Sequence, residues 1–302
     1  MTAAQFAALG MAASTVQRRA RQGGPWHRVL PGTYLVSNPP LRPGQRLRAA
    51  TLFVGSPSAF TGRTALTLYG VSSASRVPAE QVHLLIPHDR KRTSHGFVHV
   101  ERTFRWPDFR LVDGFPVAPP ARAAIDACRR MSRRGDVAAV LADVVNAELA
   151  TVEALAEELR KSQRRRSALA REVLAVMSAG PVSPAEVDLY RRWTQSALPA
   201  AQWNVNVFDP SGRLLARPDV YLPASGVVVE VDSMKHHFGR DQWDATMRRH
   251  AAMTACGLLV IHVPPARIVR EWDAVCAEVR AAVTVRGDTG PRLAWRSPMN
   301  GA

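Results

Sequence analysis

The chain has 302 residues, 46% of them hydrophobic and 22% charged, which fits about two globular domains and excludes a disordered or fibrous protein. Its longest apolar run, residues 257–261, is too short to span a bilayer, and three cysteines without Cys-x-x-Cys spacing argue against a disulfide framework or structural zinc. The first positively charged side chain is Arg18, so the N-terminus lacks the charged start of a signal peptide. We therefore expect a cytoplasmic protein without membrane contact.

The positive charge of the chain is large and uneven. The formal net charge is +15 at pH 7, and nearly all cationic residues are arginine. A GC-rich genome explains arginine in place of lysine, but it does not explain the excess of positive over negative charge. Nine arginines and no acidic residue precede Glu80. This distribution predicts a polyanionic partner, DNA, for the N-terminal part.

Residues 1–38 are predicted to form two short helices and a hairpin. The first helix covers residues 2–9, and the second begins at a Ser14 cap and ends at residues 23–24. Two β-rich runs, residues 26–30 and 33–36, follow. This order is typical of a winged helix-turn-helix that binds DNA, with the contacts made by a basic set: Arg18, Arg19, Arg21 and Arg28. The alternatives are a small helical bundle with solvated arginines, or a protein-binding module.

At these residues the chain resembles a known family. Residues 6–36 resemble the N-terminal winged helix of the antitoxin of the AbiE abortive-infection system, which binds its own promoter. Two later phrases, residues 61–70 (TGRTALTLYG) and 115–126 (FPVAPPARAAID), also resemble that larger architecture. The resemblance implies an antitoxin-like DNA-binding regulator.

Residues 39–178 are predicted to form an α+β middle domain. Strands are expected at residues 82–86 and 96–100, and one long amphipathic helix at residues 136–160. Three arginines, residues 164–166, follow this helix. They form either a solvated linker or a run that contacts nucleic acid phosphates.

Residues 179–285 are predicted to form a C-terminal domain with the order α-β-β-β-α-β, and residues 286–302 a tail. The helix begins at Ser183, and strands are expected at residues 203–208, 216–222, 227–232 and 258–263. A helix over residues 241–255 would connect the last two strands in parallel, and a final helix begins near Arg267. The whole chain is thus a multi-domain α/β protein.

Acidic residues gather on the strands of this last domain. Asp219 lies at the head of one strand, and the two-residue period of the next places Glu230 and Asp232 on one face. A hairpin between the strands would bring Asp219 beside them. Buried carboxylates are costly unless they bind a cation, so this pattern predicts a site for Mg²⁺ or Mn²⁺ with Asp219 and Glu230 as ligands. The alternative is an exposed strand face whose following histidines only cap the strand.

The segment Glu230 to His237 (EVDSMKHH) resembles the motif Glu-hydrophobic-Asp-Gly-x-x-His-His of bacterial endonuclease-like domains in the Vsr-like branch of the PD-(D/E)XK superfamily. The resemblance covers residues 183–263 and implies catalytic roles for Glu186, Asp219, Glu230, Asp232 and His236. Glu186 also fits a capping box with Ser183. The chain departs from the family pattern at three positions: Ser233, Ala245 and Thr246.

Two functional hypotheses follow. The first is a DNA-binding, Mg²⁺-dependent endonuclease that hydrolyses phosphodiester bonds in phage defence or a toxin–antitoxin system. The second is a non-catalytic, antitoxin-like transcriptional regulator whose nuclease fold has lost its activity, as the three departures would suggest. RNA as the substrate is a third, weaker hypothesis.

Overall fold

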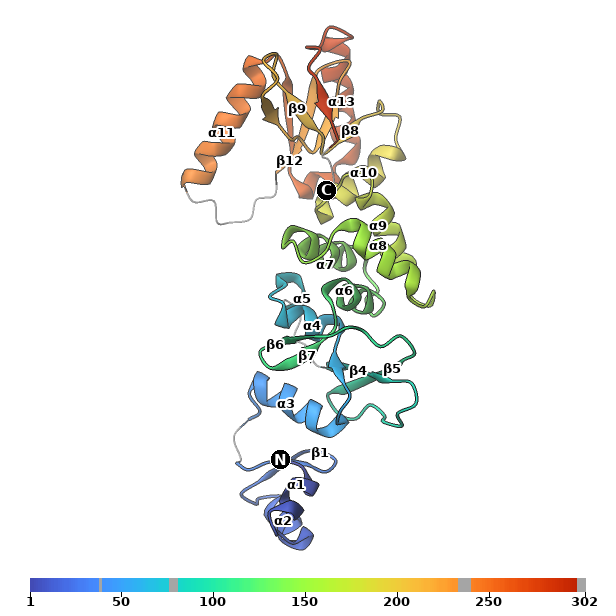
Figure 1. Cartoon of the computed structure of the whole chain (residues 1–302). Helices are drawn as coiled ribbons and strands as arrows, with labels where there is room; N and C mark the ends of the chain where they lie inside the picture. Colours follow the sequence, from blue (N-terminus) through green and yellow to red (C-terminus); the bar gives the residue numbers. More distant parts are fainter. Residues whose placement is uncertain (38–39, 76–80, 233–239, 298–302) are drawn as a thin grey trace. The chain divides into compact units, whose positions relative to one another are not determined.

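The computed structural model of the protein describes residues 1–37, 40–75, 81–232 and 240–297. The chain forms two compact units (Figure 1). The first contains residues 1–132 and 143–168, and the second contains residues 133–142 and 169–302. The sequence predicted smaller domains, with boundaries at residues 38, 178 and 285. The division into two units does not test these boundaries, so they remain predictions.

The first unit begins with a small module of two helices and a hairpin. Its elements are α1 (Ala3–Ala8), α2 (Ala13–Arg19), β1 (His27–Leu30) and β2 (Thr33–Leu35). A core of Phe6, Val16 and Trp26 holds them together, with the Phe6 and Trp26 rings stacked at 4.8 Å between centroids. Residues 1–37 contain no third helix, so the winged-helix assignment stays a prediction.

The start of α2 differs from the sequence prediction. Its N-cap is Ala12, whose carbonyl accepts hydrogen bonds from the Thr15 and Val16 amides, and no side chain caps the helix. Ser14 therefore lies inside the first turn and is not the cap. The capping box lies instead on α1, where Thr2 accepts from the Gln5 amide.

The rest of the first unit contains a five-stranded sheet in the order β5-β4-β3-β7-β6, together with helices. The strands are β3 (Ala59–Phe60), β4 (Val82–Pro87), β5 (Val98–Thr103), β6 (Arg110–Val112) and β7 (Phe115–Val117). β4 and β5 run parallel, which confirms the two strands expected near residues 82–86 and 96–100. The helices of this region are α3 (Pro43–Val54), α4 (Gly62–Leu68), α5 (Ser72–Ser75), α6 (Pro120–Cys128) and α8 (Val152–Lys161).

The single long helix predicted for residues 136–160 is wrong. The structure has α7 (Arg134–Asn146) and α8, separated by a turn. Glu148 takes a positive φ of 55° in this turn, a conformation outside the helical region, and the Thr151 hydroxyl accepts from the Ala154 amide and starts a new helix. The apolar positions continue across the break, which is why their spacing suggested one helix.

In its described part, the second unit combines two sheets with five helices and most of α7. The strands are β8 (Gln202–Trp203), β9 (Asn206–Phe208), β10 (Leu214–Ala216), β11 (Val220–Leu222), β12 (Val227–Val231), β13 (Leu259–Val263) and β14 (Trp295–Arg296). The helices are α9 (Ala168–Met177), α10 (Pro184–Thr194), α11 (Arg240–Ala255), α12 (Pro265–Arg270) and α13 (Trp272–Arg286). None of the helices in the described ranges has the length and apolarity needed to cross a membrane.

Two strands predicted as continuous are each divided between two sheets. β8 and β9 separate at Asn204, which has a positive φ of 51°, and β10 and β11 separate at residues 217–219, which contain Pro218. β9 pairs with β10 on one side and with β14 on the other in a three-stranded sheet, so residues of the predicted tail contribute a strand. The final helix is likewise divided, into α12 and α13.

The four-stranded sheet has the order β13-β12-β11-β8. β12 and β13 are parallel and are joined through α11, as the sequence predicted, and the other pairs are antiparallel. One face packs Val229 and Val263 against α10, α12 and α13. The other face packs Tyr221 and Val228 against Met253 of α11. Glu230 alternates with Val229, so its side chain belongs to the α11 face.

The aromatic core of the N-terminal module supports a direct test. We expect Phe6→Ala to cost about 3–5 kcal/mol, because it removes a buried ring from a core of three large side chains. Backbone amides of residues 1–36 should then lose protection in hydrogen exchange. Leu9→Ala is the matched control, because Leu9 is 72% exposed at the end of the same helix. Equal protection in the two variants would contradict this account of the core.

Candidate functional site

Four polar residues form a row across one level of the four-stranded sheet. The paired residues of β11 and β12 end one step before Asp219 and Glu230, so these two acids lie opposite each other. His262 pairs with Glu230 on β13. On the other side, the Asn204 amide donates to the Asp219 carbonyl at 3.2 Å. The row therefore runs Asn204, Asp219, Glu230, His262 on strands far apart in sequence.

Asp219 and Glu230 differ in how their carboxylates are satisfied. Asp219 Oδ2 accepts a 2.6 Å hydrogen bond from the Val231 amide. Glu230 is 5% exposed, and its Oε1 has no hydrogen-bond partner among the described residues. Its Oε2 lies 3.8 Å from the guanidinium of Arg249 on α11. A buried carboxylate with an unsatisfied oxygen is costly and suits a site that takes a cation.

The third acid comes from α10. Ser183 caps this helix by accepting from the Glu186 amide, which confirms the predicted cap. Glu186 is also buried, and its Oε2 accepts from the Val182 amide at 3.0 Å and from Asn204 Nδ2 at 2.7 Å. The Glu186 side chain thus binds the amide that precedes Ser183 rather than completing the predicted capping box, and it also belongs to the acid cluster. Asn204, which the sequence reading missed, links this acid to the sheet.

The acids are close enough to perturb one another. Burial raises the pKa of Asp219 to about 8, and the negative charges of Glu186 and Glu230 add to this effect. Burial also raises the pKa of Glu230, although the charge of Arg249 opposes the shift. Such shifts in neighbouring carboxyls are a feature of functional sites. At neutral pH the acids cannot all ionise without a compensating positive charge.

Asp232 faces two histidines that the sequence reading missed. Its carboxylate lies 2.9–3.0 Å from Nδ1 of His262, and Nε2 of His262 lies 2.5 Å from Nε2 of His250 on α11. Burial lowers the pKa of His250, and the nearby His262 and Arg249 lower it further. A signal was present in the sequence, because His262 is the one polar residue in an otherwise apolar strand.

Several predicted features lie outside the described residues. These are His236, proposed as a catalytic residue, and the neighbouring Ser233 and Lys235; the side chains of Ala245 and Thr246 are also outside them. The structure therefore brings together Glu186, Asp219, Glu230 and Asp232 from the predicted set. Their oxygens are not gathered around one point: within the described ranges, ligand atoms that all lie within 4.8 Å of one another occur in a different group, in the first unit.

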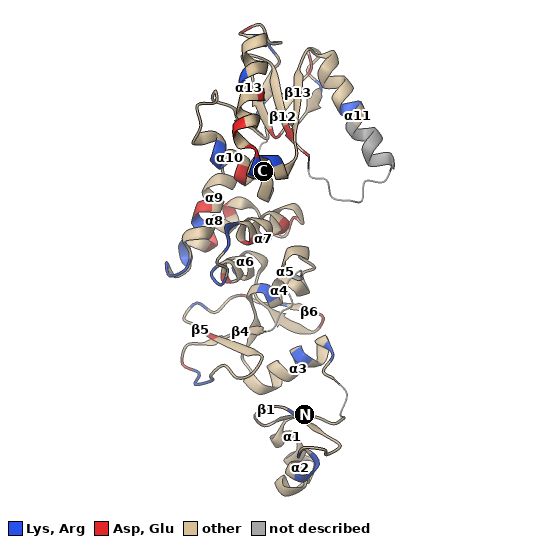
Figure 2. Cartoon of the chain, turned by 180° about the vertical axis from the view of Figure 1, so that it is seen from behind, with Lys and Arg blue, Asp and Glu red and all other residues tan. Residues whose placement is uncertain are grey.

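The predicted DNA-binding arginines are exposed on the N-terminal module. Arg18, Arg19 and Arg21 lie on or just after α2, and Arg28 lies on β1. Arg19 also stacks over the buried Trp26 ring, 5.1 Å from its centroid. Figure 2 shows basic but no acidic residues on this module. The surface is suited to a polyanion.

Comparison with known proteins places one part of the chain in a family context. Residues 58–176 match the model of the AbiEi antitoxin C-terminal domain. We call residues 58–176 the AbiEi-like region. It contains both phrases, residues 61–70 and 115–126, whose resemblance to this antitoxin was noted in the sequence. The match includes neither the N-terminal module nor the acid cluster.

Other comparisons add little. No curated protein sequence matches the chain. A solved structure, titled "Crystal structure of RV2827C protein from Mycobacterium tuberculosis", has 18% sequence identity and a TM-score of 0.40, with 64% of this chain and 78% of that chain covered. A similarity at this level supports no argument about fold or function. The nuclease-type assignment therefore depends on the residues of the acid cluster.

The raised pKa of Asp219 predicts a pH-dependent stability in metal-free protein. Folded Asp219 keeps its proton up to about pH 8, whereas an unfolded aspartic acid loses it near 3.8. The folded state therefore binds more protons, and its contribution to stability declines as the pH rises through that range. We expect Asp219→Asn in EDTA to flatten the decline in Tm between pH 5 and 8, by at least about 2 °C.

The matched control for this measurement is Asp288→Asn, an exposed acid of the same unit. Its Tm profile should parallel that of the wild type. A decline of the same size in Asp219→Asn and wild-type protein would mean that Asp219 ionises normally in the folded state.

Proposed function

We propose that the protein binds DNA and hydrolyses its phosphodiester bonds at the acid cluster of the second unit, with a divalent cation. The observation that carries this proposal is the row of Asp219 and Glu230 beside Glu186, in which a buried carboxylate oxygen of Glu230 lacks a partner among the described residues. The AbiEi-like region supports a toxin–antitoxin or abortive-infection context.

The donor set fits a hard cation. Asp219 and Glu230 would hold it, because they lie opposite each other on adjacent strands and because a positive charge offsets the burial and the repulsion that raise their pKa values. Mg²⁺ and Mn²⁺ both prefer such oxygen ligands. When bound, the cation supplies positive charge that stabilises the transferring phosphoryl group and favours loss of a proton from the attacking water.

The surrounding side chains divide the remaining tasks. Arg249, 45% exposed beside Glu230, can contact a phosphate oxygen of the substrate. An ionised Asp232 accepts from Nδ1 of His262, so a neutral His262 presents its Nε2 lone pair toward His250. Nε2 of His250 then donates its proton to Nε2 of His262. Nδ1 of His250 is the ring nitrogen left to take up the proton released by the attacking water.

The N-terminal module would supply the affinity for DNA. Its exposed arginines carry positive charge without neighbouring acids in residues 1–37. Phosphate contacts of this kind hold DNA without regard to sequence and release counterions. Binding and cleavage would therefore depend on different residues.

A second function is favoured by two observations. The matched family is an antitoxin domain, and the chain departs from the nuclease motif at Ser233, Ala245 and Thr246. These facts suit a DNA-binding regulator of the antitoxin type, in which the acid cluster is retained without catalysis. The cleavage experiment separates the two functions.

We expect wild-type protein to cut plasmid or linear DNA with Mg²⁺ or Mn²⁺ and not with EDTA. Glu230→Gln should lower the rate by at least ~100-fold, because it removes one negative charge from the cation site while keeping the shape of the side chain. Calorimetry with Mn²⁺ should show weaker binding to the same variant. Glu278→Gln, an exposed acid on α13, is the control and should cut and bind Mn²⁺ normally.

Two results would decide against catalysis. If the wild type cuts nothing with any divalent cation but still binds DNA, the regulator function takes its place. If Glu230→Gln cuts at the wild-type rate, the acid cluster is not the active site.

DNA retention should depend on salt through the N-terminal arginines. We expect the double variant Arg18→Gln/Arg21→Gln to bind DNA more weakly, and the slope of log affinity against log salt to fall by about 0.9 for each phosphate that these arginines neutralise in the wild type. Arg213→Gln, an exposed arginine of the second unit paired with Asp209, is the control. Fluorescence anisotropy in EDTA measures the DNA affinity and its salt dependence for the wild type, the double variant and the control. An unchanged slope in the double variant would place the DNA-binding surface elsewhere.

A further inference from the structure

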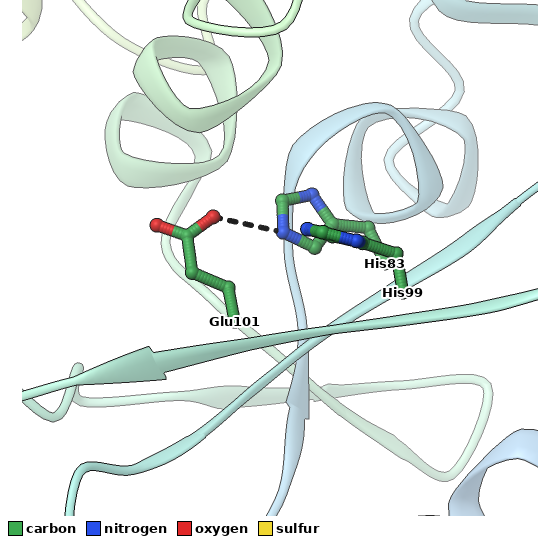
Figure 3. A group of neighbouring side chains, drawn as sticks. All are labelled: His83, His99 and Glu101. Atoms are coloured by element: carbon green, nitrogen blue, oxygen red, sulfur yellow. Dashed lines mark hydrogen bonds and ion pairs between the residues drawn. The ribbon is translucent and has the colours of Figure 1, made fainter. Parts of the chain in front are cut away.

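A cluster of ligand-type side chains lies in the first unit, outside the acid site. Figure 3 shows the side chains of His83, His99 and Glu101 pointing toward one another from β4 and β5. Two guanidinium groups already use their acceptor atoms: Arg129 donates to Glu101 Oε1 at 3.1 Å, and Arg130 lies 2.8 Å from His99 Nε2. The neighbouring positive charges disfavour a metal ion. The cluster instead fixes Glu101 and, through it, Arg129.

A cavity of about 170 Å³ lies against this cluster. Five cationic side chains line it, against one acid, Glu101: Arg102, Arg105, Arg122, Arg129 and Lys161. The cavity is smaller than the ~300–1,000 Å³ of pockets that enclose a whole organic ligand. It has room for a charged group rather than for a complete cofactor.

Two cations of this cavity are committed to acids, Arg105 to Glu158 and Arg129 to Glu101, but the other three keep donor capacity. Arg122 is 6% exposed and pairs with Asp126 through Nε, but its two terminal nitrogens reach their nearest acceptors only at 3.4 and 3.5 Å. The side chain of Arg102, on β5, has no hydrogen bond or ion pair among the residues that the structure describes. Lys161 pairs with the half-buried Glu157 at 3.1 Å. An anion in the cavity would meet N–H groups that the protein leaves weakly used.

The carboxylate that lines the cavity is itself neutralised. Burial alone would raise the pKa of Glu101, but the hydrogen bond from His83 and the charge of Arg129 outweigh it and lower the pKa to about 2. Its negative charge is therefore committed to these two partners, which orient the wall of the cavity.

An aromatic surface lies at the edge of the cavity. Phe104, one of the lining residues, is 85% exposed. Its ring stacks on that of His88, with 4.2 Å between centroids. An exposed phenyl ring beside a cationic cavity provides a flat surface for a nucleobase next to a place for its phosphate.

We propose that this cavity binds the phosphate group of a nucleotide, whose base stacks on Phe104. The phosphate comes from a free mononucleotide or from the 5′ end of a nucleic acid strand. The site is separate from the acid cluster and does not depend on the proposed cleavage activity.

Calorimetry on the full chain in EDTA and low salt tests the proposal. The probes are adenosine 5′-monophosphate, adenosine, inorganic phosphate, and a thymidine trinucleotide with and without a 5′-phosphate. We expect the phosphorylated probes to bind at least about tenfold more tightly than their unphosphorylated counterparts. Tighter binding of the mononucleotide or of the trinucleotide identifies the source of the phosphate, and either supports the proposal.

Variants locate the site. Arg102→Gln/Lys161→Gln should weaken binding of the mononucleotide about tenfold or more, whereas Arg160→Gln, on the same helix but outside the cavity, should not. Phe104→Ala should weaken the mononucleotide several-fold and leave inorganic phosphate unchanged, with Phe109→Ala as the aromatic control. These changed side chains are exposed, so the fold should persist. Three results would overturn the proposal: equal binding of adenosine and its monophosphate, no binding of the monophosphate at about 10 mM, or cavity variants that bind as the wild type does.

Discussion

The electrostatic cost of holding carboxylates at one level of a sheet governs the second unit. Asp219 and Glu230 oppose each other on adjacent strands, and Glu186 approaches from α10. Like charges directly across a strand pair are destabilising, and burial makes them more so. The fold tolerates them through a few donors: the Val231 amide, the Asn204 side chain and the more distant Arg249. One oxygen of Glu230 still lacks a partner among the described residues, and this deficit gives the proposed cation site its physical basis.

The breaks in the strands serve this arrangement. Asn204 adopts a positive φ where the chain leaves β8 for a second sheet, and its side-chain amide donates a hydrogen bond to Glu186. Pro218, between β10 and β11, lacks an amide donor and ends the earlier strand just before Asp219. Asp219 therefore lies just before the first residue of β11, whereas Glu230 stays paired with His262 in the ladder of β12 and β13.

In the first unit, buried and half-buried arginines form ion pairs with acids. In the AbiEi-like region, several buried or half-buried arginines are tied to acids, and the chain from His83 through Glu101 to Arg129 connects the sheet to the end of α6. Asp126, 1% exposed, accepts from both Thr61 and Arg122. These pairs leave an excess of cationic donors around one small cavity. The cationic cavity thus lies in the first unit, and the acid cluster lies in the second.

The sequence by itself determined the local elements and the chemical type of each site: the α10 cap at Ser183, the alternation that puts Glu230 and Asp232 on one face, and the basic N-terminal module. These follow from periodicity, capping and composition, which act over a few residues. Only the tertiary structure placed His262 beside Glu230, linked Asn204 to Glu186, divided the long helix and two strands, and gathered five cations around a cavity. Those features depend on contacts between residues distant in sequence, which capping and periodicity over a few residues do not specify.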